Sequence, residues 1–277
     1  MSNFNTLKTR TITAFFYGAV VILLLNFNIY SVHFFLFLVA FLASYEFFKI
    51  KLGNKYNKFT IFSLAIIFGA GPAITEQLIP VLTESIFEML LYIIIIYDVY
   101  LIIDLFNKKK RVYDKIIVVI AEVLLYIGIP SMLFVYISNE FLSDFFRTLF
   151  IVVILIWIND SFAYFVGSRF GKNKLLPEVS PKKTIEGFAG GGVFAIIASF
   201  LLYQIYGYFE YLFYFTAAII VFIVGTAGDL VESKLKRTYG LKDSGNALPG
   251  HGGFLDRFDS IIFTLPFVTA LLYLIIR

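Results

Sequence analysis

Four aspartates mark the places in this chain where chemistry could occur. Asp160 stands in the segment WINDSFAY, Asp229 in GTAGDLVES, and Asp256 and Asp259 in FLDRFD. All four lie in or beside strongly apolar stretches, where a carboxylate is costly unless it has a basic partner or a cation. Pairing with Lys or Arg for assembly would explain any one of them taken alone. Asp256 and Asp259 are three residues apart, so both face one pocket if a helix begins there.

The residues around these carboxylates indicate what the chemistry would be. On a helix, Asp229, Ser233, Lys236 and Arg237 would form one stripe, because residues three or four apart share a face. The chain has no cysteine and two histidines, and carboxylates are hard oxygen ligands, which suit Mg²⁺ rather than Zn²⁺. Clustered Lys and Arg beside a carboxylate-bound Mg²⁺ suit phosphate chemistry. The residues alone therefore predict a membrane enzyme that acts on phosphates.

The composition decides which elements must position these residues. Hydrophobic residues make up 60% of the 277 residues, and charged residues make up 15%, against roughly 25% in soluble domains. A soluble fold cannot bury so much apolar surface, which excludes a soluble enzyme, a disordered protein and a nucleic-acid-binding protein. The sequence predicts an all-α, polytopic integral membrane protein. We expect about nine transmembrane helices, at residues 12–30, 32–50, 59–75, 86–106, 113–137, 146–167, 187–207, 211–231 and 258–276.

The basic residues predict the orientation of these helices. With the N-terminus in the cytoplasm, all of the 23 Lys and Arg residues except Arg147 and Arg277 lie on the cytoplasmic side. This asymmetry is the one expected of bacterial and other multi-span membrane proteins, and a missed helix would spoil it. The four aspartates then lie on the cytoplasmic side together, which pairing for assembly does not readily explain. We expect a bacterial cytoplasmic membrane with the active site facing the cytoplasm.

Two regions follow from this arrangement. Residues 1–140 are predicted to form an N-terminal transmembrane region of about five helices, and residues 141–277 a C-terminal catalytic region of about four. The second region contains two long polar loops on the cytoplasmic side, at 168–186 and 232–257. Long loops in a chain whose other connections are short are usually functional.

The second loop carries a pattern that resembles the signature of the phosphatidate cytidylyltransferases, also called CDP-diacylglycerol synthases. The matching residues are Ser233, Lys236, Arg237, Lys242, Asp243, His251, Gly252, Gly253, Asp256, Arg257 and Asp259. Two upstream segments look like the same family, namely NDSFAYFVGSRFGK, from Asn159 to Lys172, and SPKKTIEG, from Ser180 to Gly187. A pattern with this many fixed polar positions is far more specific than a short glycine motif.

The resemblance implies that CTP and phosphatidate react to give CDP-diacylglycerol and pyrophosphate with Mg²⁺, a second cation being left open. It makes Asp229 and Asp256 the best metal ligands, with Asp160, Asp243 and Asp259 secondary. Candidates for the phosphates of CTP and the lipid are Lys182, Lys183, Lys236, Arg237, Lys242 and Arg257, without a division between the two substrates. Ser233 and His251 are further catalytic candidates, and the other substrate-binding candidates are Asn159, Ser180, Thr184, Glu186, Gly252 and Gly253.

Other interpretations stay open. A related enzyme could transfer from CTP to an isoprenoid-type lipid, because acceptor choice depends on the shape of an apolar groove. A cation-coupled transporter is disfavoured, since the 229–259 region has no second copy and the polar residues gather at one face. Glu46, Asp98, Asp104 and Glu122 have weaker claims to a role within the spans. The expected partners are CTP, phosphatidate and membrane lipids, without nucleic acid, and the sequence leaves a homo-oligomer open.

Overall fold

The structure is a computed structural model that describes residues 16–53, 55–78, 82–108, 112–140, 146–245 and 252–277. Within these residues, seven helices are long and apolar enough to cross a membrane. They confirm the all-α, polytopic membrane architecture that the composition predicts.

The N-terminal half is built from helices that begin at polar capping residues. An apolar helix at Phe16–Phe27 precedes α2, whose start is capped by the side chain of Asn28. Asn57 and Thr83 cap α3 and α5 in the same way, since each side-chain oxygen accepts a backbone N–H of the first turn. The elements are α2 (Ile29–Leu52), α3 (Lys58–Gly69), α4 (Gly71–Leu78), α5 (Glu84–Asp104), α6 (Ile116–Val123), the π-helical turn η1 (Leu124–Gly128) and α7 (Ile129–Glu140).

The C-terminal half adds a small β-hairpin to the helices. Its strands are antiparallel, and they lie between α8 and α9 in the predicted loop 168–186. The elements are α8 (Phe146–Phe170), β1 (Lys174–Leu176), β2 (Ser180–Thr184), α9 (Ile185–Tyr206), α10 (Tyr211–Ile220), the π-helical turn η2 (Val221–Gly225), α11 (Thr226–Thr238) and α12 (Leu255–Ile276). The predicted loop 232–257 is therefore partly helical, because α11 continues through its first residues and α12 includes its last three.

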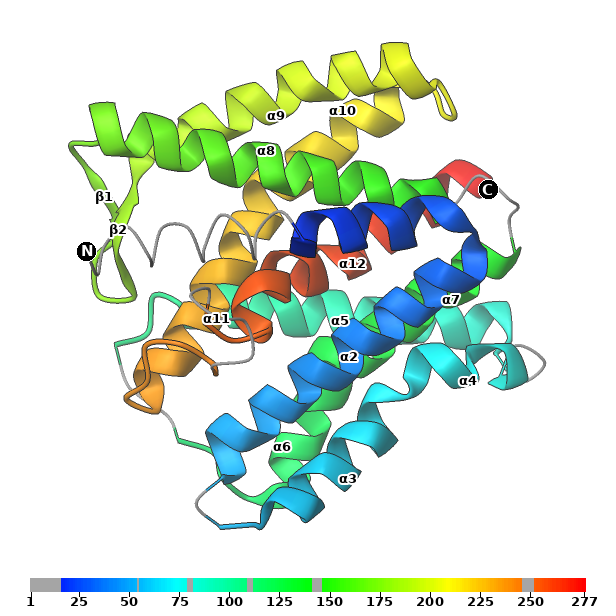
Figure 1. Cartoon of the computed structure of the whole chain (residues 1–277), viewed down its shortest axis with the longest axis vertical. Helices are drawn as coiled ribbons and strands as arrows, with labels where there is room; N and C mark the ends of the chain where they lie inside the picture. The colour runs from blue at the N-terminus through cyan, green and yellow to red at the C-terminus, as the bar shows by residue number, and fades with distance from the viewer. Residues whose placement is uncertain (1–15, 54, 79–81, 109–111, 141–145, 246–251) are drawn as a thin grey trace.

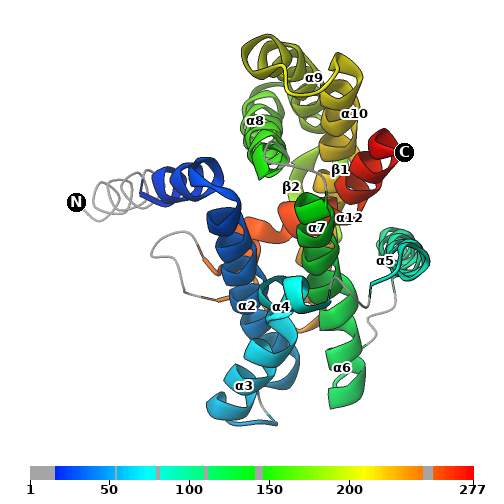
Figure 2. The ribbon, with the colours of Figure 1, turned by 90° about the vertical axis from the view of Figure 1, so that its right-hand side faces the viewer.

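Helix α12 lies at the centre of the bundle. Of its apolar stretch 67% is buried, against 22% for α5 at the periphery. It packs against α2, α5, α7, α8, α10 and α11, and Figure 1 shows it between the layer of α8 to α10 and the helices of the N-terminal half. Figure 2, turned by 90°, shows α5 at the edge of the same bundle. Residues that begin α12 are thus held from both halves of the chain.

Helices α8 and α9 run side by side because glycines line their contact. A Cβ on Gly187 would lie 2.6 Å from the carbonyl oxygen of Ala163, and one on Gly191 would lie 2.7 Å from that of Asn159. Small residues let two helix backbones approach closely where no hydrophobic effect drives them together. This contact fixes the hairpin, which joins the two helices, over the end of α8.

The predicted number of nine spans stays a prediction. Seven of the predicted spans correspond to α2, α5, the continuous α6–η1–α7, α8, α9, the continuous α10–η2–α11 and α12. The first is described only as the shorter helix Phe16–Phe27. The third is divided at Ala70 into α3 and α4, next to Pro72, whose ring cannot continue a helix from the preceding turn.

Candidate active site

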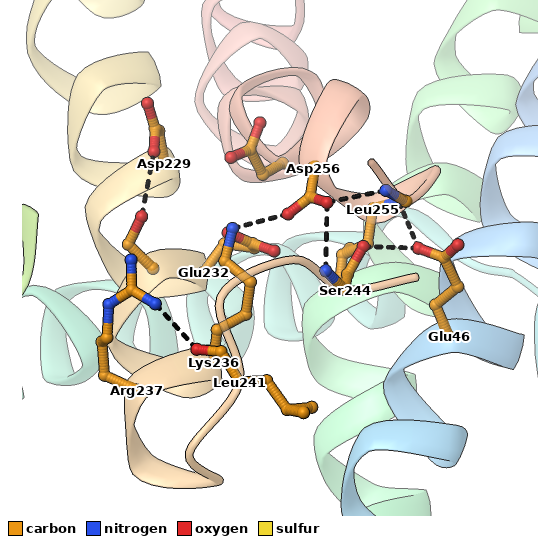
Figure 3. A network of polar contacts seen from close by, with 12 residues as sticks. Glu46, Asp229, Glu232, Lys236, Arg237, Leu241, Ser244, Leu255 and Asp256 are labelled. Atoms are coloured by element: carbon orange, nitrogen blue, oxygen red, sulfur yellow. Dashed lines mark hydrogen bonds and ion pairs between the residues drawn. The ribbon is translucent and has the colours of Figure 1, made fainter. Parts of the chain in front are cut away.

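The polar stripe predicted on the eighth span lies on α11, but its members face different partners. Ser233 Oγ donates a hydrogen bond of 3.3 Å to Asp229 Oδ1, one turn earlier. Lys236 points toward the start of α12, and Arg237 donates from Nη1 to the carbonyl oxygen of Leu241 at 2.7 Å. Helix α11 therefore carries residues of two neighbouring charged groups, and Figure 3 shows Asp229, Lys236 and Arg237 from close by.

The first group, called here the carboxylate cluster, consists of Asp160, Asp229 and Asp259 with Lys183. Lys183 Nζ lies 2.6 Å from Asp229 Oδ2, and both side chains are about one-third exposed, at 28% and 34%. Asp259 is buried, and its charge interacts with those of Asp229, Lys183 and Asp160. Three helices and the hairpin thus bring these four residues together.

Lys183 stays protonated in the carboxylate cluster. Burial alone would lower the pKa of its ammonium group. The negative charges of Asp229, Asp160 and Asp259 outweigh that effect and hold the pKa of Lys183 above its ordinary value. Strand β2 therefore delivers a fixed positive charge to a site that gathers three carboxylates.

The second group, called here the Lys236 cluster, consists of Lys236, Glu232 and Asp256. Lys236 Nζ lies 2.5 Å from Asp256 Oδ1 and 2.6 Å from Glu232 Oε2, and all three side chains are at most 10% exposed. Removing one partner of a buried ion pair is costly, because the other charge stays buried without compensation. This ammonium group therefore fixes the start of α12 against α11.

The connection between α11 and α12, called here the signature loop, is described at residues 239–245 and 252–254. The second oxygen of Asp256 binds backbone N–H groups of both of these parts. Asp256 Oδ2 accepts the backbone N–H groups of Ser244, at 3.0 Å, and Gly253, at 2.7 Å. A Cβ on Gly252, whose φ is +86°, would lie 2.7 Å from this oxygen, and one on Gly253 would overlap Ser244 Oγ. The two glycines of the motif are thus explained by the close approach of the loop to Asp256.

Glu46 of α2 is the residue whose part in this site the sequence does not reveal. It is buried, and its carboxylate accepts hydrogen bonds from Ser244 Oγ, Phe254 N and Leu255 N at 2.6, 2.9 and 2.8 Å. Figure 3 shows Glu46 joined through Ser244 to Asp256 and Lys236. The only sequence signal for Glu46 is that it is a carboxylate inside an apolar span. Asp98, Asp104 and Glu122 show the same signal.

Those three candidates have other surroundings. Glu122 pairs with Lys51 at 2.5 Å and ties α6 to α2 within the N-terminal half, while Asp104 pairs with Lys234 at 2.8 Å and ties α5 to α11 of the other half. Asp98 is 1% exposed, and its Oδ2 atom has no hydrogen-bond partner among the described residues.

The substrate-binding candidates of the hairpin and the adjoining helices make different contacts near the carboxylate cluster. Thr184 Oγ1 accepts the Gly187 N–H at 3.1 Å and caps α9, while Glu186 accepts the backbone N–H groups of Lys172 and Asn173 at 3.0 and 3.1 Å. Asn159 is buried and donates to Asp160 at 3.3 Å. These three fasten the hairpin and α8, whereas Ser180 begins β2.

The remaining candidates lie toward the surface. Lys182, Lys242, Asp243 and Arg257 are exposed, so the structure does not bring Asp243 into the carboxylate cluster. His251 lies outside the described residues.

The donor set suits a hard cation, although no ready-made metal centre is present in the described part of the chain. Within those residues, no three His, Asp or Glu side chains are arranged to hold a metal ion. Both oxygens of Asp229 are instead engaged, by Lys183 and Ser233, and both oxygens of Asp256 are engaged as well. Asp160, Asp229 and Asp259 still supply only carboxylate oxygens, which are the ligands that Mg²⁺ prefers.

Comparison with known proteins gives consistent matches. A model of the cytidylyltransferase family matches residues 8–275. A phosphatidate cytidylyltransferase of Bacillus subtilis is 47% identical over 153 residues, which are 54% of this chain and 56% of that protein. Proteins of the same name from Staphylococcus epidermidis and Staphylococcus haemolyticus are 41% and 43% identical over 148 residues, which are 53% of this chain and 55% of each relative. The chain spans about half the length of the curated relatives it matches.

Proposed function

The chain belongs to the cytidylyltransferase family, and from this premise we propose that it converts CTP and phosphatidate to CDP-diacylglycerol and pyrophosphate. The relatives named above carry the name of this activity, which supports the same acceptor here.

One structural observation carries the proposal. Two ion pairs, Lys183–Asp229 and Lys236–Asp256, lie on the same helix α11 and join both polar loops to it. The reaction brings two polyanions together, so it needs positive charge fixed at the place where they meet.

The chemistry requires little more than position and charge. An oxygen of the lipid phosphate attacks the α-phosphorus of CTP, and the bond from that phosphorus to the oxygen bridging to the β-phosphate breaks, so that pyrophosphate leaves. The lipid phosphate is already largely ionised near neutral pH, since the second pKa of a phosphate monoester is about 6. No general base is then obligatory, and Lys183, Lys236 and the exposed Arg257 orient and neutralise the phosphates.

Mg²⁺ is part of this proposal. Asp229, with Asp160 and Asp259, would hold the ion, provided that Lys183 turns its ammonium group from Asp229 toward a phosphate. The ion, when bound, neutralises phosphate oxygens as charge develops on them. Asp256, whose oxygens already hold Lys236 and the signature loop, positions the start of α12 and stays a second candidate ligand.

The membrane setting fits a lipid acceptor. We place the protein in a bacterial cytoplasmic membrane with both clusters facing the cytoplasm, on the support of the distribution of Lys and Arg and of the bacterial relatives.

The test is a product analysis with two acceptors. Purified protein is given CTP labelled on the α-phosphorus, Mg²⁺ and either phosphatidate or a phosphorylated isoprenoid lipid, and the labelled lipid is identified by mass spectrometry. We expect labelled CDP-diacylglycerol from phosphatidate and none from a Lys183→Gln variant. If the sole labelled product is a nucleotide-linked isoprenoid, the acceptor is the isoprenoid lipid and not phosphatidate. If neither acceptor yields a labelled lipid, the proposed function is contradicted.

A further inference from the structure

An apolar groove runs along one side of the bundle toward the signature loop. It has a volume of about 430 Å³ and lies between the helix Phe16–Phe27, α2 and the first turn of α12. Its walls include Val20, Leu24, Leu38 and Leu42, and Phe254 and Phe258 close it at α12. Tyr17 is its one residue with a polar side-chain atom.

The groove and the candidate active site share the first turn of α12. Phe254 and Phe258, whose rings stack 4.3 Å apart, stand on either side of Asp256 along the chain. The backbone N–H of Phe254 is also one of the three donors to Glu46. The apolar residues of the groove and the polar contacts of Glu46 and Asp256 therefore lie within a single helical turn of each other.

Tyr17 marks the junction between the two. Its ring packs edge-on against Phe258 at 5.7 Å, and against Trp157 of α8, two residues before Asn159, at 6.3 Å. Phe258 itself stands between Arg257 and Asp259 in the first turns of α12. One end of the groove therefore lies beside a cation and a carboxylate of the site, whereas its walls away from Tyr17 are apolar.

We infer that this groove binds an acyl chain of the lipid acceptor while the lipid phosphate lies at the charged residues beside Tyr17. The inference rests on the proposed function, and it names the part of the chain that recognises the lipid. A lipid phosphate held near Arg257 must leave its chains within reach of the first turn of α12. The chains of a membrane lipid come from an apolar bilayer, so an apolar path that begins at this turn retains the substrate by close van der Waals contact with its chain and not by removal of the chain from water.

The second cavity of the bundle does not suit an acyl chain. It has a volume of about 390 Å³ and lies between α2, α5, α6 and α11. Its walls carry both partners of the Lys51–Glu122 and Lys234–Asp104 ion pairs. An alkyl chain there would lie against these four charged groups and against Glu232, and it would shield all of them from water without binding any.

A matched pair of valines tests the inference by kinetics. Val20 in the groove is 53% exposed, and Val193 on α9 is 55% exposed. Val20→Trp is expected to raise KM for dipalmitoyl phosphatidate about tenfold, because the indole ring occupies space that the acyl chain fills, and to raise KM for dihexanoyl phosphatidate, whose chains are shorter, by less than about threefold. Leu38→Trp, deeper in the groove, should act the same way, while Val193→Trp and KM for CTP should not change. Equal effects on both acceptors, or none, would overturn the inference.

Photo-crosslinking gives a readout that does not depend on turnover. A phosphatidate with a diazirine on its acyl chain should label peptides covering residues 16–24 and 35–42. Excess dioleoyl phosphatidate should suppress this labelling, and dioleoyl phosphatidylcholine should not. Labelling that both lipids suppress equally, or that spreads over α9, would show bulk lipid in the groove and contradict the inference. Groove labelling without any lipid product would instead contradict the proposed function alone.

Discussion

Glu46 Oε2 accepts a hydrogen bond of 2.6 Å from Ser244 Oγ, although 198 residues separate the two in the chain. Ser244 also donates its backbone N–H to Asp256, which holds Lys236. A carboxylate on α2 therefore holds the signature loop between α11 and α12 in place. The N-terminal half is thereby part of the site and more than a membrane anchor.

Replacing Glu46 should impair turnover without removing any group of the two charged clusters. Glu46→Gln replaces a carboxyl group that accepts three hydrogen bonds by an amide with a single acceptor oxygen, and a buried donor left without its acceptor costs roughly 1–3 kcal/mol. We expect kcat to fall more than about tenfold, since about 1.4 kcal/mol corresponds to a factor of ten. A nitroxide on Leu241→Cys, in this cysteine-free chain, should become more mobile in electron paramagnetic resonance spectra.

Glu122→Gln is the matched control for Glu46→Gln, because Glu122 is a carboxylate of the N-terminal half that bonds to Lys51 of α2 instead of the loop. Unchanged turnover in Glu46→Gln, or lost turnover with an immobile nitroxide, would show that Glu46 does not position the loop.

The two adjacent lysines of β2 should differ sharply. Lys183 pairs with Asp229, while Lys182 is exposed. Lys183→Gln removes the positive charge of the carboxylate cluster and should lower kcat/KM at least about 100-fold, since one oxyanion-stabilising group often contributes that much. Lys182→Gln should lower kcat/KM less than about fivefold, which is the scale of an exposed charge of up to about 1 kcal/mol. Steady-state kinetics of both variants decides this, and similar losses would mean that the Lys183–Asp229 pair has no special part in catalysis.

Turnover should depend on a divalent cation held by α11. Excess chelator should abolish activity, and added Mg²⁺ should restore it. Asp229→Asn and Asp256→Asn should each abolish turnover while the protein remains in the membrane, because both groups fix charge at the site. Asp114→Asn, which breaks the exposed pair with Lys55, is the control and should stay active. Full activity in chelator would rule out the metal requirement.

Measuring the Mg²⁺ dependence of partly active variants separates the two aspartates. If Asp229 is the ligand and Asp256 positions α12, then Asp229→Glu should need more Mg²⁺ for half-maximal rate than the unsubstituted protein. Asp256→Glu should lower the rate at an unchanged Mg²⁺ requirement. The opposite pattern would make Asp256 the ligand.

Labelling from the two sides of the membrane checks the orientation. Cysteine at Pro177, an exposed residue of the hairpin, should react with an impermeant reagent only from the cytoplasmic side. Cysteine at Glu210, exposed in the connection between α9 and α10 at the opposite end of α9, should react only from outside. Ser244 is a poor labelling site because it is buried against Glu46. Labelling of the hairpin cysteine by the impermeant reagent outside intact cells would contradict the predicted orientation and indicate the opposite one.

Much of this architecture follows from the sequence, because local pattern is enough to specify it. Apolar runs long enough to cross a bilayer must be helices, since no water satisfies their backbone groups. The placement of Asp229, Ser233 and Lys236 on one helix follows from spacing alone. Polar residues at the ends of these runs marked the candidate site, and the structure brings Asp160, Asp229 and Asp259 together as a cluster.

The tertiary structure decided which groups meet. The stripe on α11 divides between two clusters because the hairpin approaches it from one side and α12 from the other. Glu46 could not be distinguished from Asp98 or Glu122 by sequence, because each is one carboxylate in an apolar span. Their difference lies in what packs opposite them: a loop of the other half for Glu46, a lysine for Glu122, and for Asp98 Oδ2 no hydrogen-bond partner in the part of the chain that the structure describes. The groove beside Phe258 likewise exists only where α12 meets the first two helices of the described chain, about 200 residues earlier in the sequence. Spacing along one helix does not show which of its faces another helix will cover.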